Sequence, residues 1–238
     1  MRRHRIAILL GLFIFVLTGC QAASVESPTF GAVRLTDTQA GVEESGYWIE
    51  ADLTPVETSA YSQSLRDGLA EEWRVFREIS MEERLLSSHV FGHCHFKAED
   101  WTEAVDFLGI APENPLGTRD WLEPNGAVSV YYDGTEDGTV TSAAVWALYL
   151  DGTRRIQLIV NFSGEANYTT GCTQGQTETV SMENGNTALL ITPQNTDRYC
   201  SVDAYFVQTG ALYLLHVVDE AENIRAARDT MERLLSAF

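Results

Sequence analysis

The sequence predicts an α+β fold: an antiparallel β-sheet meander, with N-terminal helices and a C-terminal amphipathic helix packed on one face. Three observations lead to this expectation. Apolar residues recur every three or four positions in a stretch before the middle of the chain and again at its C-terminal end, which is the period of a helix. Between these stretches, short apolar runs alternate with turn dipeptides. There is no alternation of strands with helices, so a parallel dinucleotide-binding sheet is disfavoured.

The chain begins with a basic and then apolar segment that is typical of an exported precursor. Arginines at positions 2, 3 and 5 precede an apolar run over 6–17, shorter than the roughly 20 residues that a membrane-spanning helix needs. The run ends in Leu-Thr-Gly-Cys at Cys20, which resembles the lipobox of bacterial lipoproteins. This resemblance implies that residues 1–19 are a signal peptide, that Cys20 is lipidated, and that the membrane is a partner through this lipid.

Composition divides the rest of the chain into two parts. Residues 20–45 are mostly small and polar and are predicted to be a flexible tether. Residues 46–238 are expected to form one α+β domain, with an N-terminal strand and helices in 46–95 and the sheet and last helix in 96–238. The expected location is the extracytoplasmic face of the cell membrane.

The chain is strongly acidic, with 16 Lys and Arg against 34 Asp and Glu and a formal net charge of −18. Loss of the signal peptide leaves 13 basic residues against 34 acidic ones, a net charge of −21. Such a chain repels nucleic-acid phosphates, so no nucleic-acid partner is expected. The charge instead favours solubility and cationic partners.

The first part of the domain is predicted to be largely helical. A short strand over 47–53 is followed over 58–80 by apolar residues with a helical period. These residues are Tyr61, Leu65, Leu69, Trp73, Phe76 and Ile79. Ser80 is a candidate cap for a second short helix, and a strand is expected over 89–96.

A further short helix is predicted over 101–108. Asp100 and Glu103 have the spacing of a capping box, which satisfies the free amides of a first helical turn. Gly109 is placed to end this helix, because a left-handed residue commonly follows the last turn.

Turn dipeptides predict the hairpins of the sheet. Asp151-Gly152 and Asn184-Gly185 lie between apolar runs, and both positions of such a turn need positive φ. A third hairpin is expected across Thr209-Gly210. The final helix is predicted over 220–237, with an apolar face of Ile224, Ala227, Met231, Leu234, Leu235 and Phe238.

Three segments carry a family resemblance. They are the helix over 101–109, the loop segment Asn-Pro-Leu over 114–116, and the strand, acidic turn and helix over 212–238. This pattern resembles a domain of unknown function found in Firmicutes lipoproteins and in the C-terminal parts of anti-sigma factors. The resemblance covers roughly residues 70–238. It implies an extracytoplasmic, non-enzymatic domain and carries no functional residues to this chain.

His89, His93 and His95 are the densest group of candidate metal ligands. On a strand, His93 and His95 would share a face at a spacing of about 6–7 Å, close enough to bind one zinc ion with a third ligand from elsewhere. The alternative is that these histidines face solvent or form hydrogen bonds in the core. Cys94 would point to the opposite face.

The two cysteines of the strand-rich part, Cys172 and Cys200, are candidates for a disulfide, because the compartment outside the membrane permits one. Such a bridge would close a loop of about 28 residues and contribute about 3 kcal/mol. The alternative is that both are free, buried thiols.

The chain contains neither a Gly-x-Ser-x-Gly motif nor a His-Glu-x-x-His motif nor a phosphate-binding glycine loop. The sequence therefore predicts a non-catalytic binding or sensing module of the cell envelope, whose partner is an envelope protein or a small ligand. The alternative function is an envelope metal-binding protein that uses His93 and His95. Trp121 either stacks on a ligand or covers the sheet edge, and burial statistics for large aromatics favour the second.

The metal hypothesis predicts that zinc raises the melting temperature of residues 21–238 relative to the protein in EDTA. At 100 times its Kd, zinc should stabilise the protein by about 2.7 kcal/mol, which is several degrees at this size. The shift should vanish in a His93→Ala, His95→Ala double variant. An absent shift in the parent protein would make these histidines ordinary strand residues.

Overall fold

The structure is a computed structural model, and it describes residues 29–30, 32–38, 45–54, 94–110, 112–134, 140–194 and 196–238. The predicted signal peptide, Cys20, the helices expected between residues 58 and 87, and His89 and His93 lie outside these ranges. No helix of the described part is long and apolar enough to cross a membrane.

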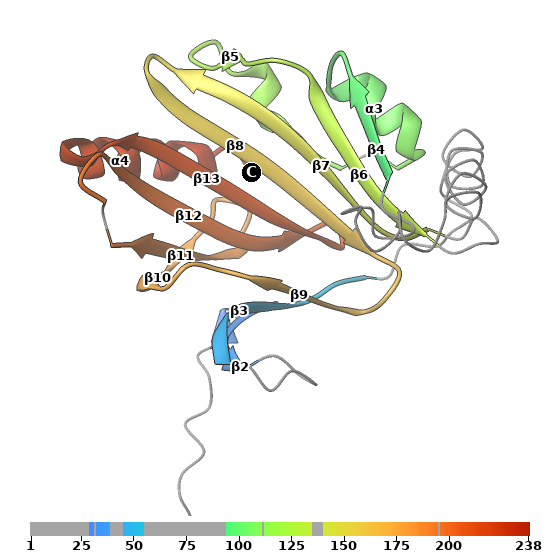
Figure 1. Cartoon of the computed structure of the whole chain (residues 1–238), viewed down its shortest axis with the longest axis horizontal. Helices are drawn as coiled ribbons and strands as arrows, with labels where there is room; N and C mark the ends of the chain where they lie inside the picture. Colours follow the sequence, from blue (N-terminus) through green and yellow to red (C-terminus); the bar gives the residue numbers. More distant parts are fainter. Residues whose placement is uncertain are drawn as a thin grey trace, which may run out of the picture.

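Two antiparallel sheets make up most of the fold (Figure 1). The larger sheet has nine strands, in the order β10-β11-β12-β13-β8-β7-β6-β4 with β5 paired to β7. Its strands are β4 (Cys94–Ala98), β5 (Glu123–Pro124), β6 (Val128–Gly134), β7 (Val140–Asp151), β8 (Arg154–Ser163), β10 (Gly175–Ser181), β11 (Thr187–Pro193), β12 (Tyr199–Gln208) and β13 (Ala211–Glu220). The smaller sheet has the order β1-β2-β3-β9, with β1 (Thr29–Phe30), β2 (Val33–Thr38), β3 (Ser45–Asp52) and β9 (Asn167–Gly171).

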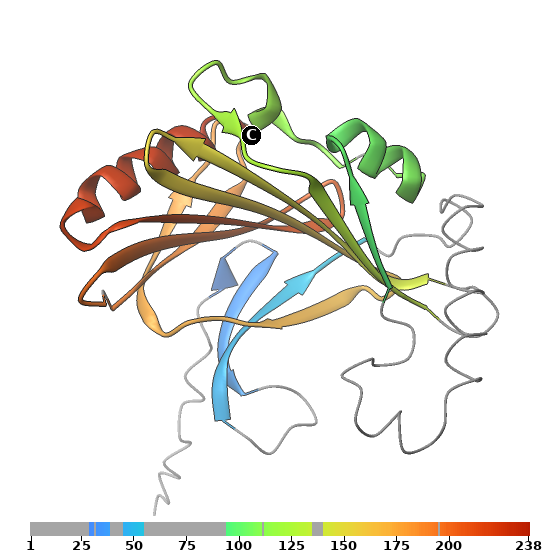
Figure 2. The same cartoon turned by 45° about the horizontal axis from the view of Figure 1, so that its top comes forward.

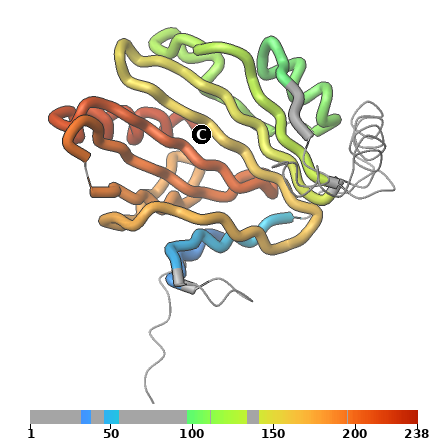
Figure 3. The backbone as a smooth tube through the Cα atoms, in the orientation of Figure 1, coloured from blue at the N-terminus to red at the C-terminus, as the bar shows by residue number. Residues whose placement is uncertain are grey.

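The helices lie on one side of the larger sheet, and the smaller sheet lies on the other (Figure 2). They are α3 (Trp101–Leu108), α4 (Ile224–Leu235) and the short 3-10 turns η2 (Pro115–Thr118) and η3 (Ala221–Asn223). The fold is therefore α+β and mostly β, and the predicted C-terminal helix is confirmed. Strand β8 leads directly into β9, which carries the chain from the larger sheet to the smaller one (Figure 3).

Hairpins form at all three predicted places, but the turn type predicted at the first two is wrong. Only Gly152 and Gly185 have positive φ there, at 65° and 83°, whereas Asp151 and Asn184 do not. Asp151 still pairs with Arg154 in the ladder, and the ladder of β10 and β11 ends at Ser181 and Thr187. At the third turn both Thr209 and Gly210 have positive φ, as a type I′ turn requires. A Cβ on Gly210 would lie 2.8 Å from the Cβ of Thr54, so this turn also needs glycine for its close approach to the chain after β3.

Two hydrophobic clusters lie on opposite faces of the larger sheet. The main cluster joins the helix-side residues of β6–β8 and β11–β13 to α3, η2 and α4. The second cluster joins Leu189, Ile191, Tyr205 and Leu212 to the smaller sheet. Strands β11–β13 are thus buried on both faces, and their apolar side chains point both ways because successive residues of a strand face opposite sides.

The smaller sheet is a departure from the predicted single meander. Residues 29–30 and 33–38 lie within the predicted tether, yet they form β1 and β2. Val33 on β2 and Ile49 on β3 are fully buried against the larger sheet. Strands β1 and β2 carry few apolar residues of their own, so their structure depends on tertiary contact with the larger sheet.

Helix α4 packs on β12 and β13 through its predicted apolar face, and Ala227, Met231, Leu234 and Leu235 are buried. The chain ends in an aromatic group in which Phe238 contacts Phe206 and Tyr213, with ring centroids 5.0 and 5.5 Å apart. These contacts hold the C-terminus of the chain against the sheet.

A charged network ties α4 to the sheet at its other end. Arg154 donates to Asp219 at 2.7 Å, to Asp151 at 2.8 Å and to the Thr230 hydroxyl on α4 at 2.7 Å. Asp219 also accepts bonds from the Glu220 amide and from Asn223. Burial alone would raise the pKa of Asp219, but the hydrogen bonds from Asn223, the Glu220 amide and Arg154 hold it below its ordinary value.

Replacement of Asp219 by asparagine should lower the free energy of unfolding by about 3 kcal/mol at pH 7, because Arg154 loses its buried partner. Because the pKa of Asp219 is lower in the folded protein, the carboxylate stabilises the fold at any pH above its pKa in the unfolded chain, which is about 3.9. This stabilisation is lost as the pH falls through the pKa of the folded protein. The difference between parent and Asp219→Asn should therefore shrink on acidification, as measured by urea unfolding from pH 7 to about pH 2.5.

The matched control is Asp229→Asn, a change to an exposed carboxylate on α4, the helix that the network joins to the sheet. It should leave the unfolding free energy nearly unchanged. An Asp219→Asn deficit that stays constant with pH would contradict this account of the network.

Candidate functional site

Cys172 and Cys200, the pair predicted to form a disulfide, are free thiols. Cys200 on β12 belongs to the main cluster on the helix side of the larger sheet. Cys172 follows β9 and packs against the second cluster, on the other side. The predicted bridge does not form in this structure, because the sheet itself separates the two side chains.

Neither thiol is activated. Burial raises the pKa of Cys172 to about 11, and the nearby Asp203 carboxylate adds to the rise. Burial likewise raises the pKa of Cys200, whose thiol donates to the Glu220 carbonyl at 3.1 Å. Since the thiolate is the reactive form, both side chains are poor nucleophiles at neutral pH.

The predicted zinc site is only partly within the described ranges. His95 lies on β4 opposite Tyr131, and Cys94 lies opposite Tyr132. His89 and His93 fall outside, so the zinc site stays a prediction. Within the described ranges, no group of three or more His, Cys, Asp or Glu residues is placed to hold a metal ion.

The structure brings together one histidine–carboxylate pair that the sequence analysis did not anticipate. His216 Nδ1 contacts Asp203 Oδ1 across β12 and β13, with 35% of the His216 side chain and 7% of the Asp203 side chain exposed. This arrangement fixes the orientation of the imidazole ring. Within the described chain no hydroxyl or thiol is hydrogen-bonded to His216, so the pair lacks the nucleophile that a hydrolytic triad needs.

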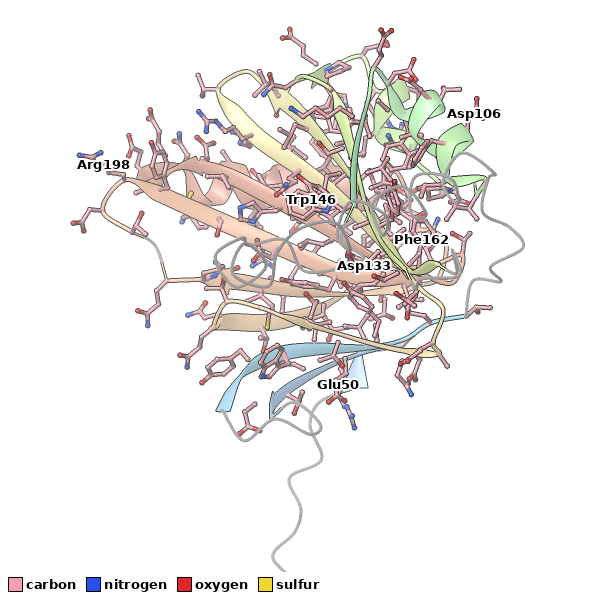
Figure 4. All side chains as sticks on the ribbon, turned by 45° about the vertical axis from the view of Figure 1, so that its right-hand side comes forward. Glu50, Asp106, Asp133, Trp146, Phe162 and Arg198 are labelled. Carbon is pink, nitrogen blue, oxygen red and sulfur yellow. The ribbon has the colours of Figure 1, made fainter. Side chains whose placement is uncertain are left out.

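Part of the larger sheet has large apolar side chains in contact with solvent. Trp146, labelled in Figure 4, and Leu148 on β7 are 37% and 42% exposed. They alternate along β7 with Val145, Ala147 and Tyr149 of the main cluster, so they lie on the face opposite the helices. Tyr131 on β6 packs against Trp146 with ring centroids 5.0 Å apart. The described part of the smaller sheet packs on β11–β13 and not on these strands.

A cavity of about 340 Å³ lies on the helix side of the larger sheet, between α3, η2, β5 and the ends of β6 and β7. This volume is at the lower end of the range for small-molecule sites. Its lining is Glu99, Asp100, Trp101, Thr102, Asn114, Gly117, Pro124, Gly126, Val128, Ala147, Leu148 and Tyr149. Val128 and Ala147 belong to the main cluster, so the apolar floor of the cavity is part of the protein core.

The wall formed by α3 is set by local sequence signals. Asp100 Oδ1 accepts the Glu103 amide at 2.9 Å, as the capping box predicts, and Glu103 Oε2 accepts the Glu99 amide at 2.6 Å. Gly109 ends the helix with φ of 67°. The Trp101 indole donates to the Pro112 carbonyl at 3.3 Å, which fixes this ring at the cavity.

The opposite wall depends on Asn114. Its side-chain oxygen accepts the Leu116 amide at 3.2 Å and so starts η2, with Pro115 at the first helical position. Its amide nitrogen donates to the Tyr149 hydroxyl at 2.7 Å. One side chain thus shapes the loop and orients a polar group of the cavity.

Tyr149 provides a buried hydrogen-bond donor. Its side chain belongs to the main cluster and is 5% exposed. Burial raises its pKa, and the bond from Asn114 opposes only part of that rise. The hydroxyl therefore keeps its proton at neutral pH, and this proton has no acceptor among the described residues.

Trp121, which the sequence singled out, lies outside this cavity lining. Its ring is partly buried against the main cluster, and the guanidinium carbon of Arg233 on α4 lies 3.8 Å from the ring centroid. In this position Trp121 covers the main cluster beside the C-terminal end of α4.

No protein-family model matches the chain, and no curated protein matches its sequence. The resemblance to a domain of Firmicutes lipoproteins therefore stays an expectation drawn from the sequence.

Proposed function

We propose that the mature protein is a lipid-anchored, extracytoplasmic binding module that holds a small ligand in the cavity between α3 and β7. The observation that carries this proposal is the buried Tyr149 hydroxyl, which is oriented by Asn114 and has its proton free at the cavity. The hydroxyl is already paired with the Asn114 amide, and its proton is the part that a ligand in the cavity can accept. A few polar groups fixed in this way orient a ligand in an otherwise apolar site.

The shape of the cavity supports the same function. Its floor is formed by residues of the main cluster, and side-chain caps hold the starts of α3 and η2. Both the oxygen and the nitrogen of the Asn114 side chain form hydrogen bonds. A preformed site of this kind binds without the cost of ordering its loops. An apolar floor with few convergent polar groups is the usual composition of a ligand site.

Two features favour binding over catalysis. Both described thiols have raised pKa values, so neither supplies a nucleophile. The His216–Asp203 pair lies on β13 and β12, strands that contribute no residue to the cavity lining. The lipid on Cys20, which we infer from the lipobox, would keep the module at the membrane.

Filling the cavity should abolish binding. A Cβ on Gly117 would lie 4.0 Å from Asn114 Nδ2, so Gly117→Leu extends beside that amide without a backbone clash. We expect at least one member of a panel of sugars, amino acids, carboxylates and organic cations to raise the melting temperature of residues 21–238 but not that of Gly117→Leu. A ligand at 100 times its Kd should stabilise the parent by about 2.7 kcal/mol.

The control is Thr118→Leu, in the same turn but outside the cavity lining. It should respond to the ligand as the parent does. Equal shifts in the parent and in Gly117→Leu, or a panel in which nothing shifts the parent, would contradict the proposal.

A further inference from the structure

We infer that the ligand of this cavity is a small organic cation that also carries a hydrogen-bond acceptor, as choline does with its ammonium and hydroxyl groups. The inference rests on the proposed binding function and names the ligand class of the same site. It follows from the charge at the cavity mouth, from the two aromatic residues of the lining and from the free proton of Tyr149.

The mouth of the cavity carries negative charge. Glu99 and Asp100 line it, and the Glu103 carboxylate is bonded to the Glu99 amide beside them. The N-terminus of α3 offsets these three carboxylates by only about half a positive charge. The described lining contains no lysine or arginine. Within this lining, the exposed carboxylates at the mouth therefore have no counter-ion.

The same geometry argues against an anionic ligand. A helix N-terminus binds anions through its free amides. Here the Glu103 amide already donates to Asp100, and the Glu99 amide donates to Glu103. Carboxylates of the protein already accept the amides at the start of α3, and they would repel an anionic ligand.

The lining of the cavity also contains aromatic residues. Trp101 and Tyr149 both line the cavity, and the indole is held by its bond to the Pro112 carbonyl. Ammonium groups are attracted to the faces of aromatic rings, most strongly to tryptophan. A quaternary ammonium has no N–H groups to satisfy, which suits the apolar floor of Val128 and Ala147.

The Tyr149 hydroxyl favours a ligand that carries an acceptor. Its oxygen already accepts the Asn114 amide, so its proton is the group that it offers to a ligand. An alcohol or carbonyl oxygen on the ligand would take this proton, while its cationic group faces Trp101 and the carboxylates. A purely apolar molecule would leave the donor unpaired.

The test compares choline with dimethylbutanol, its uncharged carbon analogue, in thermal-shift and calorimetric titrations of residues 21–238. We expect choline to bind at least about tenfold more tightly, because the analogue has the same shape but no charge to meet the carboxylates and the indole. Binding of choline should weaken as sodium chloride is raised, since salt screens exposed carboxylates.

Substitutions at three positions of the lining locate the effect. Glu99→Gln should weaken choline binding by about two- to fivefold. Asp100→Asn should do the same, because asparagine caps the helix as well as aspartate does and only the charge is lost. Trp101→Leu should weaken it by about three- to thirtyfold, and Trp101→Phe should recover part of the loss. Glu183→Gln, an exposed change outside the cavity lining, should have no effect.

The outcomes separate the two proposals. If dimethylbutanol or a neutral sugar binds in the cavity as tightly as choline, the cation inference is overturned and the binding function stands. If neither choline nor any panel member binds, both fail. Unchanged choline affinity in Glu99→Gln and Asp100→Asn would also overturn the inference, and these surface variants do not depend on repacking the core.

Discussion

The larger sheet has two apolar faces to remove from water, and the rest of the structure follows from how each is covered. Strands β11–β13 are apolar on both sides, so they need α4 on one face and the smaller sheet on the other. The Arg154 network and the Phe238 aromatic group hold α4 at its two ends. At the far end of the sheet, the described helical elements are the eight-residue α3 and the turn η2. The cavity lies where these short elements meet β6 and β7.

The candidate site combines two features that one ligand could use. The Tyr149 hydroxyl accepts the Asn114 amide and keeps its own proton for a ligand, and exposed carboxylates lie at the mouth of the cavity. One ligand with a positive group and an oxygen acceptor would contact both. This is the physical reason that links the acidic composition of the chain to a specific place in the fold.

Much of the local structure could be predicted from residue patterns, because those signals act over a few residues. The capping box at Asp100 and the turns at Gly152, Gly185 and Gly210 are of this kind. The hairpin at Thr209-Gly210 even fixes which residues face each other, so the pairing of Asp203 with His216 was within reach of the sequence.

Other features depend on contacts between distant parts of the chain. The bond between Asn114 and Tyr149 joins residues that are far apart in the sequence, and no local pattern marks it. Strands β1 and β2 exist because Val33 and its neighbours meet β11–β13, which turned part of a predicted tether into sheet. The disulfide prediction rests on the compartment and on both cysteines lying in the strand-rich part, and neither shows that Cys172 and Cys200 lie on opposite sides of the larger sheet. Composition therefore says least about which side of a sheet a residue faces, because a shift by one strand position reverses that side.

The most direct test of the account is to watch the tryptophan indole signals in a nitrogen–proton correlation spectrum of residues 21–238 during a choline titration. Trp101 lines the cavity, whereas Trp121 lies against Arg233 and Trp146 lies on the opposite face of the sheet. The account predicts a saturable shift of the Trp101 indole signal, with those of Trp121 and Trp146 unchanged. A shift confined to Trp146, or no saturable shift in any indole, would contradict a ligand site between α3 and β7.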